Sequence, residues 1–282
     1  MRWDRGYESP NIEDRRGQSF SGGGGGGLPI GGLINLFGMF GWKGILVGLV
    51  LAAVLAGGGT CLGGGGAGGC LGMGSSSQPA SGPVKATPQE DDLKHFVGYV
   101  FDDVQKTWSR QLSNYETTRI VLFRRGVESA CGTATTAVGP FYCPLDHKVY
   151  IDLSFYDELR ERFGAPGDFA QAYVIAHELG HHVQNLEGKM KSGNRPVDSV
   201  PIELQADCAA GAWAKDAEAR GEIEVGDIDE ALNAATQIGD DTIQRKQTGH
   251  VQPETFTHGS AAQRTAAFRQ GYQGGAAACG IQ

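Results

Sequence analysis

Positive charge is scarce in this chain. Its 282 residues include 24 Lys and Arg against 32 Asp and Glu, which gives a formal net charge of −8. Nucleic-acid binding needs a basic face, so this balance argues against a DNA- or RNA-binding protein. The sequence also lacks an internal repeat, which argues against a solenoid or an array of repeats. What remains is a length that suits one ordinary domain with accessory segments, or two small domains.

Cysteine is absent from the first 60 residues, and all six cysteines follow the apolar stretch described next. This asymmetry favours an oxidising compartment for the C-terminal part of the chain. The sequence alone cannot choose among the possible pairings. We expect Cys131 to pair with Cys143, because the two flank a short Gly/Thr-rich loop, and Cys208 to pair with Cys279. Buried free thiols are the alternative.

Long apolar runs are also rare, and residues 33–57 form the exception. A membrane-spanning helix needs about 20 mostly apolar residues, and only Lys43 carries a charge in this stretch. Its long stem can reach toward the interface, where Trp42 would also fit. We therefore expect a retained transmembrane helix. The alternatives are a cleaved signal, which would have a shorter leader, and a soluble apolar segment.

The distribution of basic residues predicts an orientation for this helix. No Lys or Arg occurs between Gly44 and Pro83, whereas five precede or begin the apolar stretch. The positive-inside rule then places the N-terminus in the cytoplasm and the C-terminal domain outside it, in the periplasm or the extracellular space. The five basic residues are Arg2, Arg5, Arg15, Arg16 and Lys43.

Composition divides the rest of the chain. Residues 1–32 are polar and then Gly-rich, so they cannot bury enough apolar surface to order themselves, and we expect a disordered tail. Residues 58–86 are rich in Gly, Ser and Pro and predict a flexible linker. Residues 87–282 have the composition of a folded domain.

The folded domain is expected to be α+β. Thr87-Pro88-Gln89-Glu90 has the pattern of a helix N-terminus. Two β-rich runs come next, and mostly helical spacing follows them. The expected strands are residues 118–124 and 148–153, and the longer expected helices are 167–187, 199–220, 226–246 and 259–273.

The sequence AYVIAHELGHHVQN contains an HExxH motif. His177 and His181 are four residues apart, so a helix places both imidazoles on one face, where they can bind one Zn²⁺ ion. Glu178 lies between them and can take a proton from a zinc-bound water. A structural helix with fortuitous histidines is the alternative. His182 points about 100° away from His181 and suits a structural role.

A catalytic zinc ion usually has three protein ligands and one open position. The HExxHxxGxxH template fails, because Gln184 and Glu187 occupy its Gly and final His positions. Glu203, on a following helix, is the expected third ligand. Asp207, four residues later, would orient a ligand histidine. Asp198 and Glu187 are weaker rivals for the third position, and a solvated acidic pair is the alternative reading of Glu203 and Asp207.

HELGH followed by ELQAD resembles the gluzincin pattern of thermolysin-like metallopeptidases. The longer runs GPFYCPLDHKVYIDLSFYDEL, AHELGHHVQ, ELQADCAAGAW and THGSAAQR resemble the bacterial putative neutral zinc metallopeptidase family, whose members are membrane-anchored. The resemblance covers roughly residues 87–275. It implies a zincin-like fold and zinc-dependent peptide-bond hydrolysis. It gives the ligand roles to His177, His181 and Glu203, and the base role to Glu178.

The chemistry of such a site needs a second donor for the oxyanion. His258 is the first candidate, followed by Tyr150 and His250, with a structural histidine as the alternative for His258. A peptide substrate would pair along an edge strand, for which residues 148–153 are the candidate. The competing function is a catalytically silent, zinc-stabilised binding or adaptor module of the envelope. Such a module would have no need for Glu178. The sequence predicts no oligomeric state.

Overall fold

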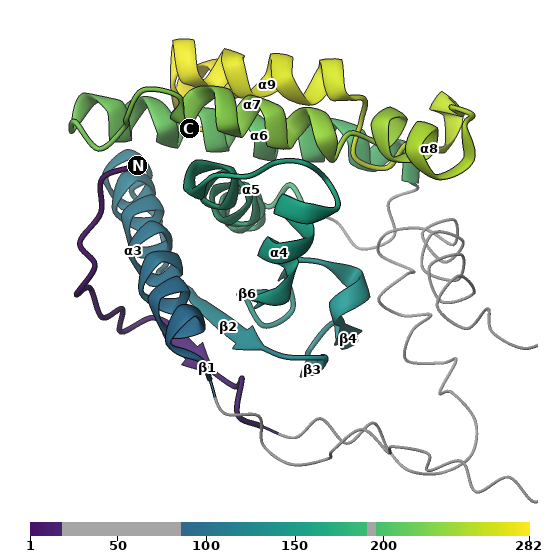
Figure 1. Cartoon of the computed structure of the whole chain (residues 1–282). Helices are drawn as coiled ribbons and strands as arrows, with labels where there is room; N and C mark the ends of the chain where they lie inside the picture. The colour runs from purple at the N-terminus through teal and green to yellow at the C-terminus, as the bar shows by residue number, and fades with distance from the viewer. Residues whose placement is uncertain (19–85, 191–195) are drawn as a thin grey trace, which may run out of the picture.

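The computed structural model describes residues 1–18, 86–190 and 196–282. The expected transmembrane helix at 33–57 lies outside these residues, as does the expected linker except for Ala86. The described chain is a mixed α+β fold, as predicted. Figure 1 shows α3 and α5 beside a small sheet, with α6, α7 and α9 across the top. The elements are β1 (Ile12–Asp14), α3 (Pro88–Gln111), β2 (Arg119–Phe123), β3 (Gly126–Ser129), β4 (Gly132–Thr135), β5 (Phe141–Cys143), β6 (Lys148–Asp152), α4 (Ser154–Glu161), α5 (Asp168–Leu186), α6 (Pro196–Ala219), α7 (Asp227–Gln237), α8 (Asp240–Thr248), α9 (Ala261–Gly274) and the 3₁₀ turn η3 (Ala276–Cys279).

Helix α3 begins where the sequence predicts. The Thr87 side chain accepts a hydrogen bond from the Glu90 backbone, and the Glu90 side chain accepts one from the Thr87 backbone, which forms a capping box. Its buried face includes Val97, Phe101 and Val104, spaced three and four residues apart. This face packs against the sheet and α5, so α3 covers one side of the core.

The main sheet has the order β1-β2-β6-β5, with β1, β2 and β6 parallel and β5 antiparallel to β6. Alternate side chains of β2 point to opposite faces of the sheet and pack into two separate hydrophobic cores. Ile120 and Leu122 face the helices, whereas Val121 and Phe123 face the hairpin of β3 and β4. The predicted disulfide between Cys131 and Cys143 is confirmed, and it joins that hairpin to β5.

The predicted substrate strand is wrong in one respect. Residues 148–153 were expected to form an edge, but β6 is paired on both sides, with β2 and with β5. Its backbone groups are therefore already occupied in the ladder. In the described sheet the edge next to α5 is β5.

The expectation of a disordered tail fails for residues 1–18, which belong to the folded domain. β1 pairs with β2 through three residues, Ile12 to Asp14. Arg16 is 4% exposed and binds both Asp14 and Asp91. The composition argument missed this because the segment contributes few apolar side chains and gains order through pairing with a distant strand. Residues 19–32 lie outside the described part.

This pairing also bears on the expected membrane orientation. A single crossing by residues 33–57 would put residues 1–18 and the domain formed by residues 86–282 on opposite sides of the bilayer. Strands β1 and β2 cannot hydrogen-bond across it. The expected arrangement, with a cytoplasmic N-terminus and an external domain, therefore does not fit the fold.

The helical layer is tied together at α6 and α9. Gly211 and Gly271 lie at the crossing, where an added Cβ would come within 2.0 Å and 1.8 Å of backbone atoms of the other helix. The predicted Cys208–Cys279 disulfide is confirmed and links α6 to η3 across a separation of 71 residues. In the chain-entropy account, a closed loop of this length stabilises the fold by about 4 kcal/mol.

The single helix expected over residues 226–246 is instead two helices, α7 and α8. The chain turns at Gly239, where an added Cβ would lie 2.4 Å from the backbone nitrogen of Ala261. Gly239 therefore lets α8 begin against the start of α9. The helical pattern continues through this break, which is why the sequence predicted one element.

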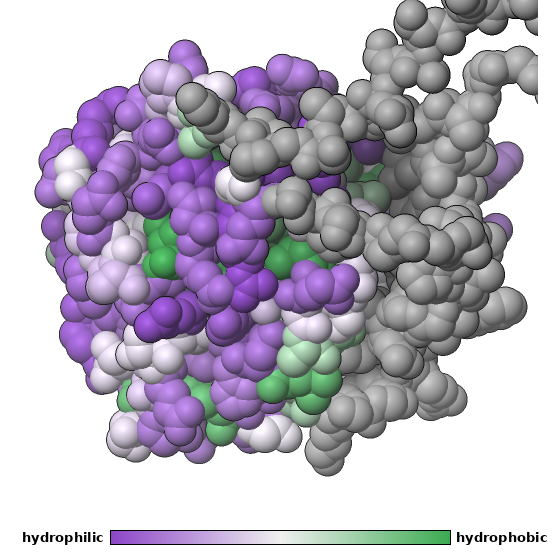
Figure 2. Space-filling model, turned by 90° about the horizontal axis from the view of Figure 1, so that it is seen from below, coloured by the Kyte–Doolittle hydropathy of each residue, from purple (hydrophilic) through white to green (hydrophobic). Residues whose placement is uncertain are grey.

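Figure 2 shows a mostly hydrophilic face on which hydrophobic side chains form small separate groups. Among the described residues, the large apolar side chains counted as exposed are Leu145 and Val225. Within residues 1–18, 86–190 and 196–282, no helix combines the length and the apolar character needed to cross a bilayer.

Candidate metal centre

Helix α5 places the two motif histidines one turn apart, with ring centroids 4.8 Å from each other. Gly180 lies between them and faces α6. An added Cβ at Gly180 would lie 3.0 Å from the Cα of Ala206. The missing side chain therefore allows the two helices to approach closely, which brings Glu203 of α6 to the histidine pair.

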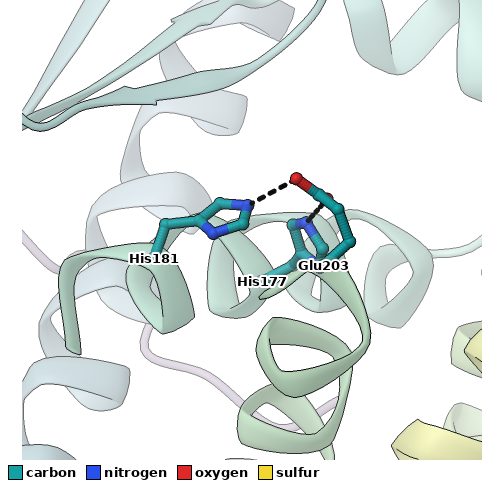
Figure 3. A group of neighbouring side chains, drawn as sticks. All are labelled: His177, His181 and Glu203. Carbon is teal, nitrogen blue, oxygen red and sulfur yellow. Dashed lines mark hydrogen bonds and ion pairs between the residues drawn. The ribbon is translucent and has the colours of Figure 1, made fainter. Parts of the chain in front are cut away.

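Three side chains converge at this crossing, as Figure 3 shows. Glu203 Oε2 lies 3.2 Å from His177 Nε2, and Glu203 Oε1 lies 3.6 Å from His181 Nε2. One ligand atom from each residue lies within 4.8 Å of the other two. All three residues are buried. Two imidazole nitrogens and a carboxylate are a donor set that zinc accepts.

The far nitrogens of both imidazoles are already engaged. His177 Nδ1 lies 2.8 Å from Asp207 Oδ1, and His181 Nδ1 lies 2.8 Å from Gln184 Oε1. Gln184 uses its amide nitrogen to donate to the Ile202 carbonyl, so its oxygen faces His181. Both acceptors fix the proton on Nδ1 and leave Nε2 free to bind a metal.

Asp207 is the centre of a buried network behind His177. Arg264 of α9 donates from Nε and Nη2, each at 2.9 Å, to the two carboxylate oxygens. The Tyr173 hydroxyl also donates to Asp207. Asp207 is fully buried and Arg264 is 3% exposed. The guanidinium therefore offsets the cost of burying a carboxylate and fixes its position against the imidazole.

The charges of the site shift the pKa of several groups. Burial alone would lower the pKa of His177, but Asp207 and Glu203 outweigh it and raise that pKa to about 10. Burial would raise the pKa of Asp207, but Arg264 and His177 lower it to about 2. Burial would also raise the pKa of Glu203, but His181 and His258 hold that pKa well below its usual range. Both carboxylates are thus anionic and attract a cation.

Glu178 differs from the other carboxylates of the site. It is 7% exposed, and its carboxylate accepts no hydrogen bond from any residue that the structure describes. Burial raises its pKa, and the charges of His177 and His181 only partly oppose the change. A carboxylate that is buried, unpaired and raised in pKa has the properties of a general base.

His258 stands just before α9 and is paired with Asp240. Asp240 Oδ2 accepts from the His258 backbone at 2.7 Å, and Oδ1 lies 3.3 Å from His258 Nδ1. Burial lowers the pKa of His258, but Glu203 and Asp240 outweigh it and raise the pKa. Its charge acts on both Glu203 and Glu178. The imidazole is 43% exposed and interacts electrostatically with these two carboxylates, so it is a candidate donor for this site.

The other predicted candidates lie elsewhere. His182 points away from the metal ligands, with Tyr142 OH 3.0 Å from Nδ1 and the Glu116 carbonyl 2.6 Å from Nε2. The Tyr150 hydroxyl donates to Asp146. His250 is exposed after α8, and Glu187 pairs with Lys189 at the end of α5. The side chain of Asp198 lies outside the described part.

A second acidic cluster, Asp168, Asp227 and Glu230, also has metal-like spacing. The amino group of Met1 lies 2.8 Å from Asp168 and 3.3 Å from Asp227. Glu230 accepts from the Phe169 backbone at 3.0 Å. These groups already have partners, so the cluster stabilises the fold and is not a metal site.

Sequence reasoning missed four residues of the metal centre: Tyr173, Gln184, Asp240 and Arg264. Tyr173 and Gln184 lie on the motif helix, one turn before His177 and three residues after His181. A search for polar residues at those spacings would have found both. Arg264 lies within the THGSAAQR run, but nothing in the sequence places it on Asp207.

Comparisons with known proteins identify the family of this chain. A family model described as "Putative neutral zinc metallopeptidase" matches residues 1–280. The uncharacterized protein YpfJ of Escherichia coli K12 is 39% identical over 98% of this chain and 96% of its own length. The uncharacterized protein Rv2575 of Mycobacterium tuberculosis H37Rv is 43% identical over 62% of this chain and 65% of its own length. No solved structure matches the chain.

Proposed function

The chain belongs to the putative neutral zinc metallopeptidase family, and from this premise we propose that it is a zinc-dependent peptidase. His177, His181 and Glu203 would hold the metal. The observation that carries the proposal is the convergence of two Nε2 atoms on one buried carboxylate, with both Nδ1 atoms held by acceptors. This arrangement supplies three ligands and leaves a position open.

The chain's own groups then divide the work. Zinc, when bound, lowers the pKa of a water and polarises the scissile carbonyl. Glu178 takes the proton from the attacking water and passes it to the leaving amine. His258, held by Asp240, donates to the carbonyl oxygen as it gains negative charge. A peptide substrate would pair with the edge strand β5, which packs on α5.

Metal removal tests this proposal. The full chain is expected to hold about one zinc ion and to cleave casein or mixed peptides. A chelator that strips the zinc should abolish turnover, and zinc added back should restore it. Metal content by atomic emission and release of fluorescent peptide would be measured on the same samples. Turnover that persists after the zinc has gone would disprove the proposal.

The alternative function, a silent zinc-stabilised adaptor, predicts a different result. Zinc would then raise the melting temperature of the chain, yet no peptide would be cleaved under any condition. The presence of Glu178, buried beside the metal ligands without a partner, favours the enzyme. Burial of an unpaired carboxylate destabilises the fold. A catalytic role as proton acceptor would explain why Glu178 is kept there, whereas an adaptor offers no such explanation.

We further propose that the domain works outside the cytoplasm, with residues 33–57 providing membrane attachment. The two disulfides support an oxidising compartment. The pairing of β1 with β2 supports residues 1–18 lying on the same side as the catalytic domain. This arrangement replaces the orientation that the basic residues predict.

Cysteine labelling tests the compartment. Glu8 and Glu161 are exposed, and they lie in residues 1–18 and in α4. Glu8→Cys and Glu161→Cys chains should both react with a membrane-impermeant maleimide in intact spheroplasts, above the background of the unsubstituted chain. Labelling of Glu161→Cys alone would place the two parts on opposite sides and contradict the proposal. Lysed cells provide the control that both cysteines can react.

A further inference from the structure

A continuous line of hydrogen bonds runs from the metal ligand His181 to the C-terminal turn η3. The side-chain oxygen of Gln184 lies 2.8 Å from His181 Nδ1. The amide nitrogen of Gln184 donates to the Ile202 carbonyl at 2.6 Å and to Gln205 Oε1 at 3.1 Å. Gln205 in turn donates from Nε2 to the Cys279 carbonyl at 2.8 Å. Two side-chain amides therefore connect α5, through α6, to η3.

The outer end of this line fixes the direction of every bond in it. The Cys279 carbonyl can only accept, so Gln205 turns its nitrogen toward Cys279 and its oxygen toward Gln184. Gln184 then uses both N–H groups, one on Gln205 and one on the Ile202 carbonyl. Its oxygen is left for His181 and accepts from the N–H at Nδ1. In the neutral imidazole, the Nε2 that faces Glu203 is thus the nitrogen without a proton.

Both amides and the carbonyl at the outer end are held firmly. Cys279 forms a disulfide with Cys208 of α6, three residues after Gln205, and Figure 1 shows the C-terminus beside the helical layer. Gln184 is fully buried, and Gln205 is half-buried. Within the described residues, the two amides make no hydrogen bonds besides those of this line. Neither amide therefore has another partner that would hold it in a different orientation.

The second acceptor of Gln184 matters for the metal ligand. Without Gln205, the Ile202 carbonyl would hold only one N–H of the Gln184 amide, and the amide plane could turn more easily. A fully reversed amide would present its NH₂ group to Nδ1 of His181. The proton of the neutral imidazole would then lie on Nε2, where it prevents metal binding.

We propose that Gln205 is a positioning residue for the metal ligand His181, on which it acts through Gln184. This inference rests on the proposed function, because it takes His181 as a zinc ligand. It also gives a role to η3, which contributes no metal ligand but supplies the carbonyl that sets the direction of both amides.

Gln205→Leu tests this role, since it removes the amide and keeps a side chain of similar size. We expect the dissociation constant for zinc to rise about fivefold, which corresponds to the loss of one neutral hydrogen bond. Gln184→Leu removes the direct partner of His181 and should raise this constant by about 10- to 100-fold. Because Gln205 acts only through Gln184, the chain with both substitutions should match Gln184→Leu. Titration of the metal-free full chain in competition with a chromophoric zinc chelator measures all of these constants.

Gln270→Leu is the matched control. Gln270 donates from Nε2 to the Ala278 carbonyl at 2.6 Å, so it holds the same turn but is hydrogen-bonded to neither amide of the line. Its loss should leave the dissociation constant for zinc unchanged. A merely structural role for Gln205 would lower the melting temperature of the metal-free chain and likewise leave zinc binding unchanged.

Each outcome decides a separate point. A Gln205→Leu chain that binds zinc as tightly as the wild type would overturn the positioning role, as would an equal loss in Gln270→Leu. Additive losses in the double variant would also overturn it, because Gln205 would then act by another route. A wild type that binds zinc but cleaves no peptide would overturn the peptidase proposal alone, since the zinc affinities would still decide the role of Gln205. A wild type that binds no zinc would overturn both.

Discussion

Glu178→Gln is expected to reduce peptide turnover by about 1,000-fold, within the range that general-base catalysis contributes. The amide has nearly the same shape but cannot accept a proton. The hydrogen bonds that hold the two imidazoles come from Asp207 and Gln184 and not from Glu178, so the positions of the imidazoles should not change. Zinc content should therefore stay at the wild-type value. Single-turnover rates with a fluorescent peptide, measured beside metal content, check both expectations.

Two further variants give losses of turnover and of zinc with which the Glu178→Gln result can be compared. His181→Ala should lose zinc and turnover together, because it removes a ligand. His258→Ala should keep its zinc and lose about 100-fold in kcat, the usual cost of removing one oxyanion donor. A Glu178→Gln chain that keeps more than about a tenth of wild-type turnover would show that the base lies elsewhere in the molecule.

The stability of Glu178→Gln separates catalysis from folding. The folded state raises the pKa of Glu178 through burial, which means that the charged form destabilises the fold. A neutral amide avoids this cost. The variant should therefore melt at the wild-type temperature or above it, even while it is inactive.

Removal of residues 1–85, which include the segment 1–18 that pairs with the domain, is expected to have the largest effect on folding. A chain that begins at Ala86 should lose about 5 kcal/mol or more of its free energy of unfolding, a large part of the stability of an ordinary domain. It loses the β1 ladder, the buried Arg16 and the partners of Asp102, which accepts from Tyr7 and Asn11. Urea unfolding followed by circular dichroism measures the difference.

Addition of residues 1–18 as a separate peptide provides the control. The peptide should bind the truncated chain and raise its unfolding midpoint in proportion to the logarithm of peptide concentration. A peptide with Arg16→Gln should bind the truncated chain much more weakly, because Asp14 and Asp91 lose the guanidinium that they share. An unfolding midpoint that is the same for the truncated and full chains would contradict this prediction.

The local parts of this fold could be predicted from the sequence. The capping box at Thr87 and the helix around His177 and His181 depend on spacings of three and four residues. The Glu203–Asp207 pair follows the same rule on its own helix. The convergence of these two helices was inferred from chemistry, since zinc requires a third ligand, and the geometry agrees with it.

The parts that could not be predicted depend on distant contacts. β1 lies in a polar segment, and its strand character comes from pairing with a strand more than a hundred residues later. In the sequence Arg264 looks like an ordinary helix residue. Its role becomes visible only in the structure, where α9 packs on α6. The edge position of β5 likewise depends on the order of the strands, which short runs of sequence do not reveal.

Asp207 holds an imidazole, a phenol and a guanidinium at once. A relative without the proposed hydrolytic activity would still need this carboxylate, because it pairs with the buried Arg264 and accepts from Tyr173. Their retention in a relative therefore says little about whether that relative is a working enzyme or a pseudoenzyme. Glu178 makes no hydrogen bond to another described side chain, so a relative that needs no general base would lose no hydrogen bond by its substitution. Under the proposed peptidase function, the residue at position 178 is the better guide to which relatives are active.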